Sequence, residues 1–257
     1  MPMKRPFVVL YVTASIDGRI APCPDVTLSN MEKYHLGNYP GYELLFGGWD
    51  PFCNSIKELH NPDAYMEGSN MIMYEGQEVK TLTGFTGDTA ALYVDFLPDE
   101  VVHRSGRNTW LIIVDGQGRL RDGYKGEPPE SHILHLTSNS APPEYLAFLR
   151  REHIPYLISG EKRVDLKGMM KKMHKILAIK TIATSSAGKL GGALIRQDLI
   201  DEINILFNPF IIGGTRTPNL FRSTENDPPD IMPARLELIS KEFYANGSFW
   251  IRYKVLR

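Results

Sequence analysis

Residues 185–190 read Ser-Ser-Ala-Gly-Lys-Leu, a run of short side chains followed by one cation. The run lies between a strand-like stretch at 179–183 and a helical stretch at 193–197. Backbone N–H groups and the dipole at the start of a helix attract phosphate. The spacing matches neither a P-loop nor Gly-x-Gly-x-x-Gly, so a diphosphate cradle and a plain small-residue turn both stay open.

Two other segments have residue types that suit a site. Asp17-Gly18 predicts a sharp turn at the carboxyl end of the apolar run 6–14, where α/β sheets bind ligands. A carboxylate there can relay a proton, which makes Asp17 the catalytic candidate, and it can equally serve only to form the turn. The stretch 63–71 contains Gly68-Ser69-Asn70, which suits either a phosphate-facing turn or an ordinary loop.

The elements that must position these residues alternate between strand and helix. Helical patterns at 142–150 and 165–173 separate several of the apolar runs. This alternation predicts an α/β fold with a mostly parallel central sheet flanked by helices. Asn246-Gly247 predicts an antiparallel C-terminal hairpin. We expect a single domain over 1–257, with an insertion or lid at 75–109. The strand-like runs are 6–14, 110–115, 132–136, 155–158, 179–183 and 202–207.

Composition excludes several classes of function. With 29 basic and 30 acidic residues, the net charge of −1 predicts no attraction to nucleic acid. No apolar run reaches the ~18 residues of a membrane-spanning helix. The amino terminus lacks a cleavage site, so we expect a cytoplasmic protein. His132 and His135 point to opposite faces of one strand and the other histidines are scattered, so we expect no metal site.

Four segments, taken in order, resemble the reductase domain of the riboflavin-pathway deaminase/reductase proteins. This is the family of 5-amino-6-(5-phosphoribosylamino)uracil reductases, which has a dihydrofolate-reductase-like fold. The last segment is the most specific, because it combines the small-residue loop, a helix, a strand and Gly213-Gly214. The segments are VTASIDGRIA at 12–21, DAYMEGSN at 63–70, WLIIVDGQGRL at 110–120 and SSAGKLGGALIRQDLIDEINILFNPFIIGG at 185–214.

The resemblance implies an NADPH-dependent oxidoreductase of riboflavin biosynthesis, with NADH not excluded. It also implies a homodimer that reduces a small pyrimidine-type substrate. Ala14 and Ile20 would line the nicotinamide, and Asp17 would lie close to the substrate. Gly68 and Ser69 would meet phosphate at a helix start, and Thr137 and Ser138 would lie near the adenosine ribose. The pyrophosphate would be held by Ser186, Ala187, Gly188, Lys189 and Leu190.

The chain departs from the family pattern at two points. Family members usually read Glu-Gly-Gly at 185–187, so the carboxylate expected near the substrate is replaced by Ser185. Related folds often have an Arg after Gly68 to grip a 2′-phosphate, and here the residue is Ser69. Two alternatives therefore accompany the reductase hypothesis. One is a non-catalytic nucleotide-binding or assembly protein on the same scaffold, and the other is a pterin or imine reductase.

Overall fold

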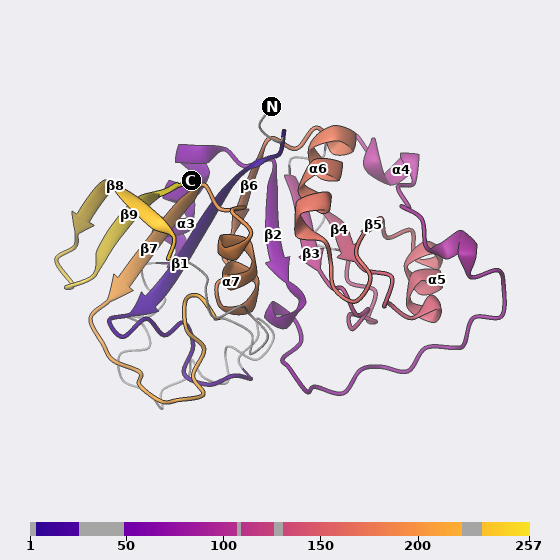
Figure 1. The fold of residues 1–257 in the computed structure, drawn as a ribbon, viewed down its shortest axis with the longest axis horizontal. Helices are drawn as coiled ribbons and strands as arrows, with labels where there is room; N and C mark the ends of the chain where they lie inside the picture. The colour runs from indigo at the N-terminus through magenta and orange to yellow at the C-terminus, as the bar shows by residue number, and fades with distance from the viewer. Residues whose placement is uncertain (1–3, 26–48, 107–108, 126–130, 223–232) are drawn as a thin grey trace. The chain divides into compact units, whose positions relative to one another are not determined.

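The computed structural model of the chain describes residues 4–25, 49–106, 109–125, 131–222 and 233–257 (Figure 1). The chain forms two compact units, each built from distant parts of the sequence. The first comprises residues 1–6 and 63–182, and the second comprises residues 7–62 and 183–257. The boundary falls within strand β6 (Thr181–Thr184). The single domain expected over 1–257 stays a prediction.

The first unit contains four parallel strands in the order β5-β4-β3-β2. Because the strands are parallel, their carboxyl ends lie at one edge, where Gly68 is level with Val114 and Thr137 with Ile158. The elements of this unit are β2 (Ala64–Gly68), η1 (Ser69–Met71), η2 (Ala90–Leu92), α4 (Asp99–Val102), β3 (Thr109–Val114), β4 (Ser131–Thr137), α5 (Pro143–Arg151), β5 (Tyr156–Ile158) and α6 (Leu166–Leu177).

Local sequence explains where the two longer helices of this unit begin. A proline occupies the first turn of α5, where its missing N–H costs nothing. Helix α6 starts at Asp165, whose carboxylate accepts from the backbone N–H of Gly168 at 3.0 Å. It ends at Ala178, which adopts a left-handed conformation. Both helices were predicted, and α6 continues four residues beyond the expected end at 173.

The stretch 75–109 was expected to be an insertion or a lid. Its middle part is held firmly within the first unit, because Phe96 exchanges two backbone hydrogen bonds of 2.9 Å with Tyr156 of β5. The Tyr93 hydroxyl donates to the carbonyl of Ala141 at 2.8 Å, and Lys172 Nζ lies 2.8 Å from the Asp95 carboxylate. Residues 93–96 therefore cover the β5 edge, and the lid role stays a prediction.

The second unit contains strands in the order β1-β7-β9-β8. β1 and β7 are parallel, whereas β9 runs antiparallel to both β7 and β8. The predicted α/β class and the antiparallel C-terminal hairpin are thus confirmed. The elements are β1 (Phe7–Ser15), α3 (Trp49–His60), α7 (Gly188–Arg196), β7 (Glu202–Asn208), β8 (Arg235–Phe243) and β9 (Phe249–Leu256).

The two helices that the structure describes in the second unit, α3 and α7, lie on opposite faces of its strands. Phe52 of α3 contacts Tyr11 of β1 and Trp250 of β9, with ring centroids 6.1 and 5.4 Å apart. On the other face α7 approaches β1 so closely that a Cβ at Gly191 would lie 3.2 Å from Leu10 Cδ1. This helix therefore covers the face to which Leu10 belongs (Figure 1).

A buried ionic cluster lies beneath α3. Glu202 Oε1 is 3.1 Å from His60 Nε2, 3.0 Å from Asn204 Nδ2 and 3.0 Å from Arg252 Nη2. Burial opposes ionisation of Glu202, but the hydrogen bonds from His60, Asn204 and Arg252 outweigh it and lower the pKa of Glu202 to about 2. The cluster ties α3 to β7 and β9.

Replacing Glu202 tests this cluster. We expect Glu202→Gln to lower the free energy of unfolding by about 3 kcal/mol at neutral pH, because it leaves the half-buried Arg252 and the buried end of the cluster without their counter-charge. The folded pKa lies below the ~4.3 of an unfolded Glu, so the stabilisation is complete above that pH and disappears as the pH falls towards 2. Urea titrations at pH 7 and pH 3 measure this. The exposed Glu58→Gln is the control, and equal effects of the two variants would contradict the prediction.

Candidate functional site

The carboxyl ends of β1 and β7 meet at one edge of the second unit, where Ser15 is level with Asn208. Asp17 lies two residues after Ser15, and its carboxylate accepts hydrogen bonds from a side chain and from the backbone. Ser15 Oγ donates to Oδ1 at 2.6 Å, while the backbone N–H groups of Ile212 and Gly213 donate at 3.1 and 2.8 Å. Asp17 therefore joins the turn after β1 to the loop after β7.

These bonds determine the protonation state of Asp17. The hydrogen bond from Ser15 is the main cause that lowers the pKa of Asp17 to about 2, and those from Gly213 and Ile212 add to it against the opposing effect of desolvation. At neutral pH the group is a carboxylate. It can accept hydrogen bonds and contribute negative charge, but it has no proton to donate.

The loop after β7 is folded against the turn that contains Asp17. Arg19 Nη1 donates to the carbonyl of Thr217 at 3.1 Å, and the Ile20 N–H donates to the carbonyl of Pro218 at 3.0 Å. Gly213 and Gly214 have φ of 70° and 84°, a conformation that other residues rarely adopt. The Gly-Gly pair is thus required by the shape of the loop.

The helix start at residue 188 differs from the predicted cradle. The Ser186 N–H donates to Thr184 Oγ1 at 3.2 Å, the Ala187 N–H to the Ser185 carbonyl at 2.8 Å, and the Gly188 N–H to the Leu220 carbonyl at 2.8 Å. The amides of residues 186–188 therefore already have acceptors in the protein. Lys189 and Leu190, expected in a loop, belong instead to the first turn of α7, whose amides lack acceptors within the helix.

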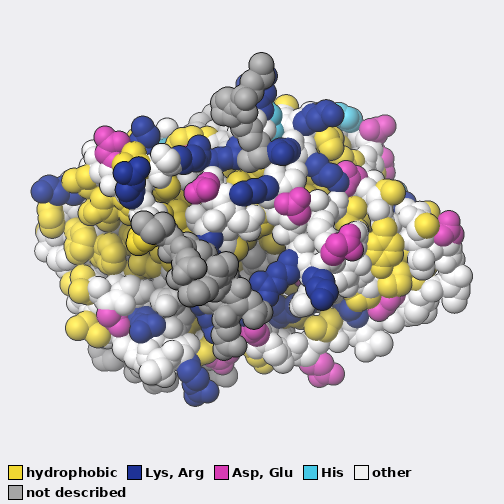
Figure 2. Space-filling model, in the orientation of Figure 1, with side chains coloured by type: hydrophobic (Ala, Val, Ile, Leu, Met, Phe, Trp, Pro, Cys, Tyr) yellow, Lys and Arg dark blue, Asp and Glu magenta, His cyan; other side chains and the backbone are white. Residues whose placement is uncertain are grey.

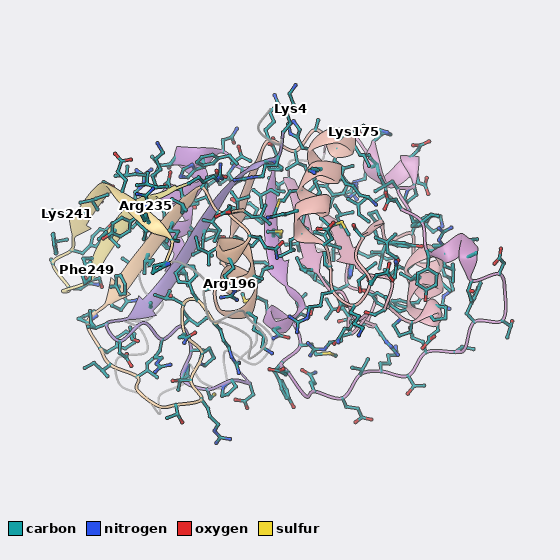
Figure 3. All side chains as sticks on the ribbon, viewed as in Figure 1. Lys4, Lys175, Arg196, Arg235, Lys241 and Phe249 are labelled. Carbon is teal, nitrogen blue, oxygen red and sulfur yellow. The ribbon has the colours of Figure 1, made fainter. Side chains whose placement is uncertain are left out.

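The small residues around this helix start have a packing role. A Cβ at Gly192 would lie 2.2 Å from the carbonyl oxygen of Arg222, so any other residue would displace the chain there. The same carbonyl accepts from Arg196 Nη2 at 3.1 Å, and Figure 3 labels Arg196 on α7. Part of the small-residue pattern is thus explained by the close passage of segment 220–222.

The structure does bring the helix start next to the turn after β1. A Cβ at Gly188 would lie 3.6 Å from Ile20 Cδ1, and Leu220 contacts both segments through backbone hydrogen bonds with Gly18 and Gly188. Ala14, predicted to line the nicotinamide, is fully buried within β1. Asp17, Ile20, Gly188 and the loop after β7 therefore form one constellation within the second unit.

The remaining predicted residues lie in the first unit, at the edge where its strands end. Gly68 ends β2, and Ser69 opens the 3-10 helix η1. Arg119, which the motif analysis did not single out, donates from Nη1 to Asn70 Oδ1 at 2.7 Å and from Nη2 to the Tyr74 carbonyl at 2.6 Å. Arg119 places a cation beside the turn at Gly68. Its position within the quoted motif WLIIVDGQGRL was the sequence signal that could have identified it.

Thr137 ends β4 and Ser138 follows it, and both are fully buried. The Ser138 hydroxyl donates to the Gly116 carbonyl at 2.7 Å, so it supports the loop after β3. Thr137 Oγ1 has no hydrogen-bond partner in the described parts of the chain. A buried hydroxyl without a partner is costly, so this atom fits contact with a polar group that lies outside the described residues.

Sequence reasoning also missed a buried polar cluster after β3. Tyr145 Oη donates to Asp115 Oδ2 at 3.1 Å and lies 2.8 Å from His135 Nδ1. Burial lowers the pKa of His135 to about 4, despite the nearby Asp115, and raises the pKa of the Tyr145 hydroxyl. Gly118 is required beside this cluster, since a Cβ would lie 2.5 Å from the Tyr145 ring. The cluster is enclosed within the first unit.

Within the parts of the chain that the structure describes, no group of three or more His, Cys, Asp or Glu side chains could hold a metal ion. In the same parts, no helix has the length and apolar character needed to cross a membrane.

Comparisons with known proteins identify the family. Residues 6–248 match the model of the RibD C-terminal domain, and the chain belongs to this family. A protein of Methanothermobacter thermautotrophicus, named 2,5-diamino-6-ribosylamino-4(3H)-pyrimidinone 5′-phosphate reductase, is 24% identical over 95% of this chain and 94% of its own. One of the same name from Aquifex aeolicus is 22% identical over 85% and 83%.

The fold has a solved counterpart. A pyrimidine reductase-like protein from Corynebacterium diphtheriae superposes with a TM-score of 0.64, over 98% of this chain and 92% of the other, at 17% identity. The predicted family, its fold and its oxidoreductase class are thereby confirmed. The predicted site residues are not tested by these comparisons and stay predictions.

The Asp17 junction predicts a pH-dependent effect of substitution. Asp17→Asn replaces one acceptor oxygen with an NH2 group that faces backbone donors, so we expect a loss of about 1–2 kcal/mol in unfolding free energy at pH 7. Because the folded pKa lies below the ~3.9 of an unfolded Asp, the difference should disappear as the pH falls towards 2. Urea denaturation measures it, and a constant difference down to pH 2 would contradict this origin.

The close approach at Gly192 gives a second prediction. We expect Gly192→Ala to lower the unfolding free energy by about 1–3 kcal/mol, because the added methyl group overlaps the Arg222 carbonyl. Gly84→Ala is the matched control, since a Cβ there meets no atom within 4 Å. Thermal unfolding of the two variants distinguishes them. A neutral Gly192→Ala would show that segment 220–222 does not pack on the helix as described.

Proposed function

We propose that this protein is an NADPH-dependent reductase whose substrate is a pyrimidine-type heterocycle carrying a ribose phosphate. The observation that carries the proposal is the match of residues 6–248 to the RibD C-terminal domain. Two relatives that align over most of their length are named as reductases of a ribosylaminopyrimidinone 5′-phosphate. The constellation at Asp17 supplies a polar, charged edge at the strand ends, where ligands of α/β proteins bind.

In this proposal Asp17 acts by position and charge. Its low pKa keeps it ionised, so it is suited to orient a substrate N–H or O–H, or a water that delivers the proton, rather than to give up a proton itself. Its bonds to Ile212 and Gly213 also set the path of the loop after β7. Bound NADPH would supply a hydride for an electrophilic carbon of the substrate.

The residues present fit the cofactor in part. Lys189 brings a cation, and Leu190 an amide, to the first turn of α7, where the helix dipole favours phosphate. In the first unit, taken by itself, Thr137 Oγ1 has no hydrogen-bond partner among the described residues, and Arg119 brings a cation beside Gly68 and Ser69. The amides of residues 186–188 do not support the proposal, because they have internal acceptors. We therefore assign diphosphate binding mainly to Lys189 and Leu190.

A second candidate function is supported by the same helix start. The internally bonded amides at 186–188, together with Ser185 in place of a Glu, favour a protein that keeps the scaffold without reductase activity. Such a protein would bind a nucleotide or take part in an assembly. The pterin or imine reductase remains the alternative within the enzyme class. We also propose a homodimer located in the cytoplasm.

Binding and turnover separate these functions. We expect purified protein to show tryptophan quenching and a thermal shift with NADPH, and to oxidise NADPH when 2,5-diamino-6-ribosylamino-4(3H)-pyrimidinone 5′-phosphate is added. NADH in a parallel titration measures the cofactor preference. Binding without turnover of this substrate or of a pterin would favour the scaffold protein. Absence of binding to either nucleotide would remove the reductase proposal.

Lys189 provides a sharper test of the cofactor assignment. We expect Lys189→Met to weaken NADPH binding about tenfold, which corresponds to ~1.4 kcal/mol, because one phosphate contact is lost. Lys167→Met, an exposed lysine on α6, is the control and should leave the affinity unchanged. Isothermal titration measures both dissociation constants. Equal affinities for the two variants would place the phosphates elsewhere.

A further inference from the structure

The loop that follows β3 is held from inside the first unit by one buried carboxyl group. Asp115 is exposed to only 1%, and its Oδ2 atom accepts from the backbone N–H of Leu120 at 2.9 Å and from Tyr145 Oη at 3.1 Å. Its backbone carbonyl accepts from the N–H of Gly118 at 3.3 Å. Asp115 therefore closes the loop 116–120 at two points.

The tyrosine that bonds to this carboxyl group is itself fixed. Tyr145 is fully buried, and its Oη atom lies 2.8 Å from His135 Nδ1. The hydroxyl has a single hydrogen, which goes to Asp115, so the histidine nitrogen is the donor in this contact. Gly118 packs on the ring, where a Cβ would lie 2.5 Å from Tyr145 Cδ1. The side of the loop that faces α5 is therefore rigidly supported.

The loop after β3 brings a cation, Arg119, to the segment that follows β2. The guanidinium group donates from Nη1 to Asn70 Oδ1 at 2.7 Å, and from Nη2 to the carbonyls of Met73 and Tyr74 at 3.1 and 2.6 Å. The three acceptors are separated from Arg119 by 45 to 49 positions in the sequence. Arg119 therefore bridges three points of segment 70–74.

Segment 70–74 has little support from its own backbone. The N–H groups of Ile72 and Met73 both bond to the carbonyl of Ser69, at 3.1 and 2.9 Å, within the short 3-10 helix η1. Hydrogen-bond geometry in a 3-10 turn is poorer than in an α-helix, and such a turn is used only in short pieces. The three bonds from Arg119 therefore add the support that this turn lacks.

The opposite end of the same loop supports the residues at the end of β4. Ser138 Oγ donates to the carbonyl of Gly116 at 2.7 Å. A Cβ at Gly116 would lie 3.2 Å from Val164 Cγ2, so the segment after β5 packs on the loop as well. Thr137, with its buried hydroxyl, is the neighbour of Ser138. Loop 116–120 therefore joins the ends of β2 and β4, where the predicted cofactor contacts of the first unit lie.

The bonds of Arg119 distinguish it from other cations near these strand ends. Figure 2 shows several Lys and Arg side chains over the region where Figure 1 draws the lower ends of β2 and β3. Lys162 and Arg163, which follow β5, are exposed. Positive charge in this region therefore does not depend on one residue. Arg119 is only partly exposed and is directed at protein acceptors, which its planar group can bond at fixed angles and a lysine cannot.

We propose that Asp115 and Arg119 are positioning residues for the cofactor-binding edge of the first unit. Asp115 fixes the loop after β3, and the loop fixes the guanidinium group of Arg119. That group holds segment 70–74, so the turn at Gly68 and Ser69 keeps a single shape before a ligand arrives. The inference rests on the proposed reductase function, because it assigns both residues a role toward the cofactor which that function requires.

Hydrogen exchange of the free protein tests the support of the turn. We expect Arg119→Lys to speed exchange of the Ile72 and Met73 amides about tenfold, because a lysine does not bridge the three acceptors and the turn then opens more often. Exchange of the amides within β4 should stay unchanged, which shows that the effect is local. Arg151→Lys, at an exposed position on α5, is the matched control. Unchanged exchange of the two amides in Arg119→Lys would overturn the proposal.

Cofactor titration separates positioning from a direct charge contact. Arg119→Lys keeps the charge, so a role in charge alone predicts wild-type affinity, whereas positioning predicts NADPH binding about tenfold weaker. Arg119→Met should weaken binding by at least the same factor. Wild-type affinity of Arg119→Lys would overturn the positioning role and leave the reductase function intact. A wild-type protein that binds neither NADPH nor NADH would remove the reductase function, and the positioning role toward a cofactor with it.

A double-variant cycle tests whether Asp115 acts through Arg119. Asp115→Ala should weaken NADPH binding about tenfold by itself and cause little further loss in the Arg119→Lys background, because both changes loosen the same turn. Additive losses would overturn the chain of contacts. Circular dichroism checks the fold of each variant. Should Asp115→Ala not fold, Tyr145→Phe takes its place in the cycle, since it removes one bond to the same carboxyl group.

Discussion

The bond between the carboxylate of Asp17 and the backbone after β7 is the constraint on which the candidate site depends. Ser15, Ile212 and Gly213 all donate to this one group, so the turn after β1 and the loop after β7 form a single structure. The same bonds keep Asp17 ionised. A residue that looks like an acid catalyst in the sequence is therefore better suited to hold a turn in place and to present negative charge.

The helix start near residue 188 shows how one pattern can serve two purposes. Small residues are needed there because the chain at Arg222 passes within contact of Gly192, and the nearby amides are bonded within the protein. A ligand at this place is our proposal, which starts from membership in the RibD C-terminal domain family. Both facts are consistent if packing accounts for the glycines while the first turn of α7, with Lys189 and Leu190, faces the ligand.

Most elements were predictable because their signals are local. Apolar runs identified β1, β3, β4, β5, β6 and β7, and Asn246-Gly247 identified the hairpin within one or two residues of its observed ends. Strand β2 and helix α3 were missed. The five residues of β2 include Glu67 and Tyr65, which break a simple apolar pattern, and α3 begins beside Pro51, where an apolar repeat is hard to recognise. Their identity depends on packing against neighbours that are distant in the sequence.

The sequence by itself determined the α/β class, the hairpin, the family resemblance and the candidate residues, because these depend on short-range periodicity and on motifs. Only the tertiary structure decided the acceptor of the Gly188 amide, since this acceptor is the carbonyl of Leu220, thirty-two positions away. It likewise placed Arg119 beside Asn70. Such arrangements arise from contacts between distant segments, which local patterns do not encode.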